Sequence, residues 1–147
     1  MNRSTQASRL REQVRLLERR LGFLNENDMS CCGVTLAQCH ALVEIGRAGA
    51  ISLRELAELL GLDNSTASRT IQNLVTRGLV SREASAEDRR YVTITLTETG
   101  RELFLGVEAR MEHRFGEICS TLPPEKREQV LEALGLLLGA LEPKGCC

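Results

Sequence analysis

The sequence has 147 residues, 42% of them hydrophobic and 27% charged, which is the size and composition of one globular domain with its own core. Only 3% are aromatic, so Leu, Val, Ile and Ala must fill that core, and such a composition favours helices. The formal net charge is −1, from 19 basic and 20 acidic residues, so the chain lacks the overall positive field of a general nucleic-acid binder. Any DNA binding must come from local patches of positive charge.

Membrane and secretion signals are absent from the pattern. No apolar run approaches the ~18 residues of a membrane span, and the first residues contain no apolar segment of the kind that secretion signals carry. We therefore expect a cytoplasmic protein without a membrane partner. In that compartment its six cysteines are expected to be reduced.

Two helices are predicted in the first 50 residues. Residues 5–24 carry one apolar face, made of Leu10, Val14, Leu17, Leu21 and Leu24. Arginines occupy the other faces, either as a solvated basic surface or as a supplementary contact to phosphates. Residues 25–33 are polar and turn-like, a second helix begins at Thr35, and residues 46–50 end it. Its expected inward residues are Leu36, Cys39, Leu42, Val43 and Gly46.

A helix-turn-helix is predicted next. Ser52 and Glu55 have the Ser-x-x-Glu spacing of a capping box, in which the hydroxyl and the carboxylate satisfy each other's backbone donors. Gly61 supplies the tight turn after this helix, Asp63 can cap the following one, and Gly78 stops it after about residue 77. The buried face of the first helix is expected to be Leu53, Leu56, Ala57 and Leu60.

The second of these helices has two faces of opposite character. Its inward positions are Ala67, Ile71, Leu74 and Val75, and its outward positions are Ser65, Ser68, Arg69 and Gln72. Hydroxyls, an amide and a guanidinium together are the groups that read base edges and phosphates in a major groove. Taken alone, the same face is also compatible with an ordinary solvated surface.

A β-hairpin is predicted after it. Residues 79–83 and 91–96 carry the alternation and β-branched residues of paired strands, and residues 84–90 form the tip. At that tip Asp88 can hold a neighbouring arginine, Arg89 or Arg90, in one rotamer and so lower the entropy cost of inserting it into a narrow minor groove. An isolated Asp-Arg-Arg is weak evidence, because most charged turns are merely soluble.

The C-terminal third is predicted to be helical. Thr97 caps a helix whose apolar residues are Leu103, Val107, Met111, Phe115 and Ile118, and Pro123 and Pro124 break it. A last helix over residues 125–141 carries Val130, Leu131, Leu134, Leu137, Leu138 and Leu141. These helices are more apolar than a monomer of this size needs, so we expect a homodimer whose dimerisation region comes from both chain ends. Two-fold symmetry would set the two reading helices about 34 Å apart, one DNA turn.

The predicted fold class is thus mainly α with a small β-wing, a winged helix-turn-helix. We divide the chain into residues 1–34 (first helix and cysteine-bearing loop), residues 35–100 (DNA-binding domain) and residues 101–147 (dimerisation helices with a cysteine tail).

Residues 53–100 resemble the multiple-antibiotic-resistance regulator (MarR) family of bacterial winged-helix transcription factors. The resemblance rests on Leu56-Ala57, Leu60-Gly61, Ser65-Thr66-Ala67-Ser68-Arg69, Leu74-Val75-x-Arg77-Gly78-Leu79-Val80, Asp88-Arg89-Arg90 and Ile94-x-Leu96-Thr97-x-x-Gly100. It implies an obligate dimer on a pseudo-palindromic DNA duplex, with a recognition helix in the major groove and Arg90, braced by Asp88, in the minor groove. The DNA-contact set is then Ser65, Thr66, Ser68, Arg69, Gln72, Asp88, Arg89 and Arg90.

The cysteines lie outside this matched segment and suggest how DNA binding is controlled. Adjacent Cα atoms are ~3.8 Å apart, less than the roughly 4.4–6.8 Å of relaxed disulfides, so neither Cys31-Cys32 nor Cys146-Cys147 should readily close on itself. Vicinal thiols instead chelate soft ions. With Cys39 seven residues after Cys32, three sulfurs could hold trivalent arsenic or antimony, and Cys146 and Cys147 could add more.

The leading hypothesis is a repressor released from DNA by a thiophilic metalloid or heavy metal, with no obligatory cofactor. Three alternatives stay open: an oxidant sensor, a regulator of a small organic ligand with incidental cysteines, and a metal-buffering protein with the winged helix as a scaffold. Cys119 and Cys39 are also compatible with small buried hydrophobes, and His40 or His113 could complete a zinc site. No enzyme motif is present, neither Cys-x-x-Cys, a glycine-rich phosphate loop nor a catalytic triad.

Overall fold

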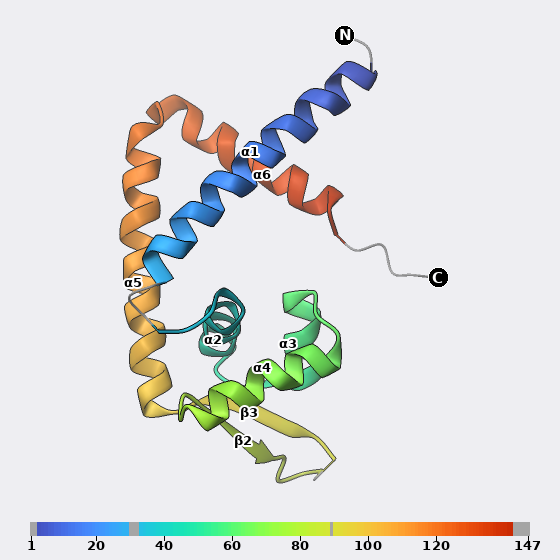
Figure 1. The fold of residues 1–147 in the computed structure, drawn as a ribbon, viewed down its shortest axis with the longest axis vertical. Coiled ribbons are helices and arrows are strands. Elements are labelled where there is room, and N and C mark those ends of the chain that lie inside the picture. Colours follow the sequence, from blue (N-terminus) through green and yellow to red (C-terminus); the bar gives the residue numbers. More distant parts are fainter. Residues whose placement is uncertain (1–2, 30–32, 89, 143–147) are drawn as a thin grey trace. The chain divides into compact units, whose positions relative to one another are not determined.

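The computed structural model describes residues 3–29, 33–88 and 90–142, with the backbone alone for residues 23–29. It is mostly helical with one small antiparallel sheet (Figure 1), so the predicted fold class is confirmed. The chain forms two compact units, one reaching Val107 and one beginning at Glu108, and the two are described separately. The elements in order are α1 (Arg3–Met29), α2 (Leu36–Ala48), β1 (Ile51–Ser52), α3 (Leu53–Leu60), α4 (Asn64–Thr76), β2 (Val80–Ala84), β3 (Val92–Leu96), α5 (Glu98–Thr121), a 3-10 turn (Pro124–Lys126) and α6 (Arg127–Ala140).

The core of the first unit lies between α2, α3, α4 and the sheet. α2 packs against α3, α4 and β3, so it is the central element of this unit. The largest fully buried side chains come from each of these elements: Leu42, Ile45, Leu56, Ile71, Leu74 and Ile94. All are aliphatic, as the low aromatic content requires.

Local capping chemistry fixes where the helices begin. The hydroxyl of Ser52 accepts from the backbone N–H of Glu55 at 3.1 Å, and the Glu55 carboxylate accepts from the Ser52 N–H at 3.0 Å. The predicted capping box is therefore present. Thr35 and Gln38 form a second capping box at the start of α2. Gly61, with φ of 64°, makes the left-handed turn that joins α3 to α4.

The sheet has three strands in the order β1-β3-β2, all antiparallel. β2 and β3 form the predicted hairpin, with Arg82 opposite Ile94 and Val80 opposite Leu96. β1 consists of two residues and was not predicted from the sequence. It pairs Ser52 with Thr93 and Ile51 with Ile94, so β3 is held on both edges.

The start of α5 closes against the turn after α4. The Thr97 hydroxyl donates to the Gly78 carbonyl at 2.6 Å and accepts from the Gly100 N–H at 3.1 Å, which confirms Thr97 as a cap. A Cβ at Gly100 would overlap the Leu79 carbonyl, so only glycine fits this close approach.

Several local predictions were wrong. α1 continues to Met29 instead of ending near residue 24. Leu36, expected inward, is 43% exposed, because it is the first residue of α2 and precedes the turn that packs on the core. Cys119, expected to be a buried hydrophobe, is exposed.

In the second unit, Pro123 and Pro124 end the long helix as predicted, and α6 follows after the short 3-10 turn. Most large apolar residues of α6, and Leu141 directly after it, are exposed in this single chain: Val130, Leu131, Leu134, Leu136, Leu138 and Leu141. No helix among the described residues has the length and apolar character to cross a membrane.

Candidate nucleic-acid interface

The reading helix α4 begins at a well-formed cap. One Asp63 carboxylate oxygen accepts from the Thr66 N–H at 2.8 Å and the other from the Thr66 hydroxyl at 2.7 Å. These bonds, the hydroxyl one foremost, lower the pKa of Asp63, so it is ionised where it faces the positive end of the helix dipole. Arg69 then donates to the Thr66 Oγ1 at 3.4 Å. Thr66 is thus engaged in the cap, which holds the first two turns of α4 in place.

The two faces of α4 have the predicted characters. Ala67, Ile71 and Leu74 are at most 1% exposed and pack into the core. On the other side Ser65, Arg69 and Gln72 are exposed and Ser68 is half-buried. The structure therefore brings a hydroxyl, a guanidinium and an amide to one outer face of α4, and it places Ser68 at the edge of that face.

The wing tip carries a braced arginine, as expected. The Arg90 Nη2 donates to the Asp88 Oδ2 at 2.8 Å, and its Nε lies 3.1 Å and 3.2 Å from the two carboxylate oxygens. The backbone N–H of Arg90 also donates to Asp88 at 3.0 Å. The pair lowers the pKa of Asp88, chiefly through the Arg90 side chain, and raises the pKa of Arg90. The Arg90 side chain is 86% exposed, so its guanidinium is oriented and still accessible. Arg89 lies outside the described residues.

A shallow groove of about 350 Å³ lies between the starts of α3 and α4 and the wing residues that lead from the tip into β3. It therefore runs between the two elements that the sequence assigns to the two DNA grooves. Its lining residues are Ser52, Leu53, Arg54, Asn64, Arg90, Tyr91 and Val92.

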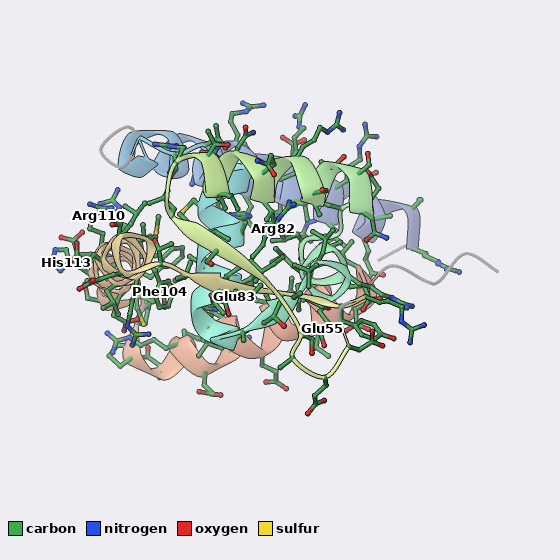
Figure 2. All side chains as sticks on the ribbon, turned by 90° about the horizontal axis from the view of Figure 1, so that it is seen from below. Glu55, Arg82, Glu83, Phe104, Arg110 and His113 are labelled. Carbon is green, nitrogen blue, oxygen red and sulfur yellow. The ribbon has the colours of Figure 1, made fainter. Side chains whose placement is uncertain are left out.

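Sequence reasoning missed two long-range side-chain contacts, one from β2 to α4 and one from the end of α4 to α2. Arg82 of β2 donates from Nη2 to the Ser68 carbonyl at 3.2 Å, and in Figure 2 its label lies beside α4. Arg77, just after α4, donates to the Gln38 Oε1 at 3.0 Å. The sequence did offer one indication for Arg82: on its predicted strand, the residues two positions before and after it, Val80 and Ala84, are apolar.

The proposed effector residues are only partly visible. Cys39 is buried, 5% exposed, on the first turns of α2. Cys31, Cys32, Cys146 and Cys147 lie outside the described residues. His40 is exposed, and His113 lies 3.6 Å from a Glu117 oxygen. In the part of the chain that the structure describes, no group of three His, Cys, Asp or Glu residues could hold a metal ion.

The capped reading helix, the sheet and the arginine-tipped hairpin together define a winged helix-turn-helix protein. Residues 33–90 match the family model described as the MarR family. The HTH-type transcriptional regulator YfiV of Bacillus subtilis, itself described as uncharacterized, is 29% identical over 109 residues, which cover 74% of this chain and 68% of YfiV. The central segment of the chain therefore matches the MarR family, and the chain is similar to HTH-type transcriptional regulators. Proteins of this family are DNA-binding regulators and not enzymes, in agreement with the prediction from the sequence.

Solved structures share the fold. Streptococcus pneumoniae FabT in complex with DNA has a TM-score of 0.82 at 20% identity, with 92% of this chain and 97% of FabT covered. A mutant of MarR from E. coli, complexed with operator DNA, has a TM-score of 0.78 at 22% identity, with 94% of this chain and 99% of that MarR chain covered. At these identities the likeness establishes the fold alone.

Proposed function

We propose that this protein is a homodimeric repressor that binds a pseudo-palindromic operator in double-stranded DNA and is released from it by a thiol-binding effector. One observation carries the DNA-binding part: the Asp63-capped helix α4 and the Asp88-braced Arg90 belong to the same compact unit. DNA in the FabT and MarR structures supports the same role for this chain.

Each element has a task that follows from its chemistry. α4 enters the major groove with Ser65, Thr66, Ser68, Arg69 and Gln72, where Arg69 can donate two hydrogen bonds to a guanine edge and Gln72 can pair with adenine. The wing follows the minor groove with Arg90, together with Arg89 and Asp88. Because Arg90 is already held by Asp88, less side-chain entropy is lost when it binds.

The near-neutral net charge makes these few arginines important. With −1 overall, affinity cannot come from a general attraction to phosphates. It depends on cations placed at the interface, so single arginine substitutions should have large effects.

A second copy of the chain is the proposed partner of the exposed apolar helices. In the first unit, α1 exposes Leu10, Leu16 and Leu17 by 49%, 37% and 41%. In the second unit, α6 exposes Leu131, Leu136 and Leu138 by 63%, 73% and 66%. Rows of exposed leucine on long helices are typical of an obligate interface that has been separated. The dimer supplies the two reading helices that a two-fold operator requires.

The proposed effector is trivalent arsenic or antimony, or another soft metal ion, bound by Cys31, Cys32 and Cys39, with Cys146 and Cys147 as further ligands. Thiolates favour such ions, and vicinal cysteines supply two sulfurs at once. Binding would change the separation of the two reading heads. A differential affinity of ~5.5 kcal/mol between the two dimer shapes is enough to shift the population from 1:99 to 99:1.

DNA binding is tested with a duplex that the wild-type protein selects from a random-sequence pool. Arg69→Ala and Arg90→Ala should each weaken binding about 5- to 150-fold, the ~1–3 kcal/mol expected of a good base contact. Arg101→Ala, an equal charge change on α5, is the matched control and should change affinity less than twofold. Equal affinities for all three variants would support the metal-buffering alternative instead.

The effector is tested by titrating arsenite, and separately peroxide, into the reduced protein–duplex complex. Release by arsenite that disappears in a Cys31→Ser, Cys32→Ser double variant supports the metalloid site. Release by peroxide alone makes the protein an oxidant sensor. If neither releases the DNA, and native mass spectrometry finds no metal adduct, the cysteines are incidental and the effector is a small organic ligand.

A further inference from the structure

Arg82 occupies an unexpected position on the wing. In β2, Val80, Arg82 and Ala84 share one face because side chains alternate along a strand. Val80 is 2% exposed and Ile94, directly opposite Arg82 on β3, is 1% exposed, whereas Arg82 and Ala84 are exposed, so the buried part of this face ends at Arg82. Arg82 therefore lies where this face of the wing passes from the core to solvent.

The guanidinium of Arg82 reaches the middle of the reading helix. Its Nη2 donates to the Ser68 carbonyl at 3.2 Å, while the methylene stem can lie along the apolar face of the sheet. Glu83, the next residue, points to the opposite side of the strand (Figure 2). This bond joins a strand of the wing to α4 at a residue of the DNA-contact set.

We propose that Arg82 is a positioning residue that holds the wing at a fixed place relative to α4, so that both DNA grooves are engaged together. This inference rests on the proposed DNA-binding function and deepens it. Its physical basis is preorganisation: a hairpin already oriented toward the minor groove loses less freedom on binding than a mobile one. This gain in binding free energy applies only when α4 and the wing both contact the DNA, as they do on a cognate operator. Arg82 therefore increases specificity more than general affinity.

The competing role is a direct contact from Arg82 to a DNA phosphate, and salt dependence separates the two. A lost phosphate contact weakens specific and non-specific binding by the same factor and lowers the slope of log K against log salt by about 0.9 per subunit. A lost positioning bond leaves the slope unchanged, because no counterion-releasing contact is removed.

The experiment compares Arg82→Met with the wild type on the selected duplex and on a scrambled duplex of equal length, over a series of salt concentrations. Methionine keeps an unbranched apolar stem and removes the donors. Specific affinity should fall about five- to tenfold, the effect of one hydrogen bond. Non-specific affinity should stay within twofold and the salt slope should be unchanged. Arg101→Met, the same change on α5, should alter none of these quantities.

A double-mutant cycle sharpens the test. In an Arg90→Ala background, Arg82→Met should cost less than twofold, because a wing without its minor-groove arginine gains little from being positioned. If Arg82→Met does not fold, judged by its thermal unfolding midpoint, Arg82→Leu replaces it, since leucine is also uncharged and has no donor. If Arg82 contacted a phosphate, either variant would lower the salt slope by the same amount.

Two results would overturn the inference while leaving the DNA-binding function intact. One is a loss of about 0.9 in slope per subunit with parallel losses on both duplexes, and the other is unchanged specific affinity. If the wild-type protein selects no duplex from the pool, the proposed function fails and the inference fails with it.

Discussion

Gly46 and Phe104 provide a test of how α2 packs against α5. A Cβ at Gly46 would lie 2.6 Å from the Cγ and Cδ2 atoms of the Phe104 ring and 2.7 Å from Cδ1, closer than atoms in real side chains approach. Gly46 lies within α2, where alanine is favoured over glycine by about 1 kcal/mol in an unhindered helix. The steric cost of an added methyl group in a packed site is about 1–3 kcal/mol. Gly46→Ala should therefore lower the free energy of unfolding by up to about 2 kcal/mol.

The sign of this effect should depend on Phe104. In a Phe104→Ala background the Cγ and Cδ atoms are absent and the steric cost disappears, so Gly46→Ala should raise the free energy of unfolding by about 0.5–1 kcal/mol. Urea unfolding followed by far-UV circular dichroism gives the free energy of unfolding of the wild type, the two single variants and the double variant. All are measured at one protein concentration, because the unfolding midpoints of oligomers depend on concentration. An equal effect of Gly46→Ala in both backgrounds would refute the contact between α2 and Phe104.

Three further predictions concern the interface. Asp63→Ala should weaken operator binding and speed amide exchange in the first turn of α4. Asp63→Asn can still accept from the Thr66 N–H and should retain most of the operator affinity and most of the protection from exchange. Similar losses in the two variants would argue against the cap. Arg90 lowers the pKa of Asp88, so the ion pair stabilises the wing fully at pH values above the ordinary aspartate pKa, and this stabilisation is lost as the pH falls through the lowered pKa. NMR chemical shifts of wing residues should therefore change only in that acidic range. Asp88→Asn should abolish this pH-dependent change. Leu138→Glu should shift the protein from dimer to monomer in sedimentation equilibrium, with a Leu59→Glu variant, exposed to a similar degree on α3, remaining dimeric.

Local chemistry explains why the helix-turn-helix could be predicted from the sequence. α3 and α4 are short, and their ends are set by Ser52, Gly61 and Asp63, whose partners are within four residues. Asn64–Thr76 differs from the predicted bounds of α4 by one residue at its C-terminal end. The pairing of Asp88 with Arg90 was also predictable because it spans two residues.

Features that depend on distant partners could not be predicted in this way. β1 has only two residues, too few for any periodicity, and its pairing partners lie some 40 residues further on in β3. Arg82 shows the same limit, because nothing near it in sequence identifies the Ser68 carbonyl as its acceptor.

The wrong predictions for the end of α1 and for Cys119 have separate causes. α1 continues through a polar stretch because asparagine and aspartate cost at most about 0.7 kcal/mol per residue in an established helix. Cys119 follows Ile118, the last residue of the apolar stripe on α5, and one residue further turns the side chain about 100° away from that stripe.

Ser52 serves two structures at once, since it pairs with Thr93 in the sheet and caps α3 with its hydroxyl. A slip of β1 against β3 by one residue would exchange the faces of the strand and remove the oxygen that the Glu55 N–H needs. A wrong register between β1 and β3 therefore carries the free-energy cost of an uncapped helix. The start of α3 thus aligns β3 at Thr93, close to the tip that carries Arg90, and an error in this strand pairing costs α3 its cap.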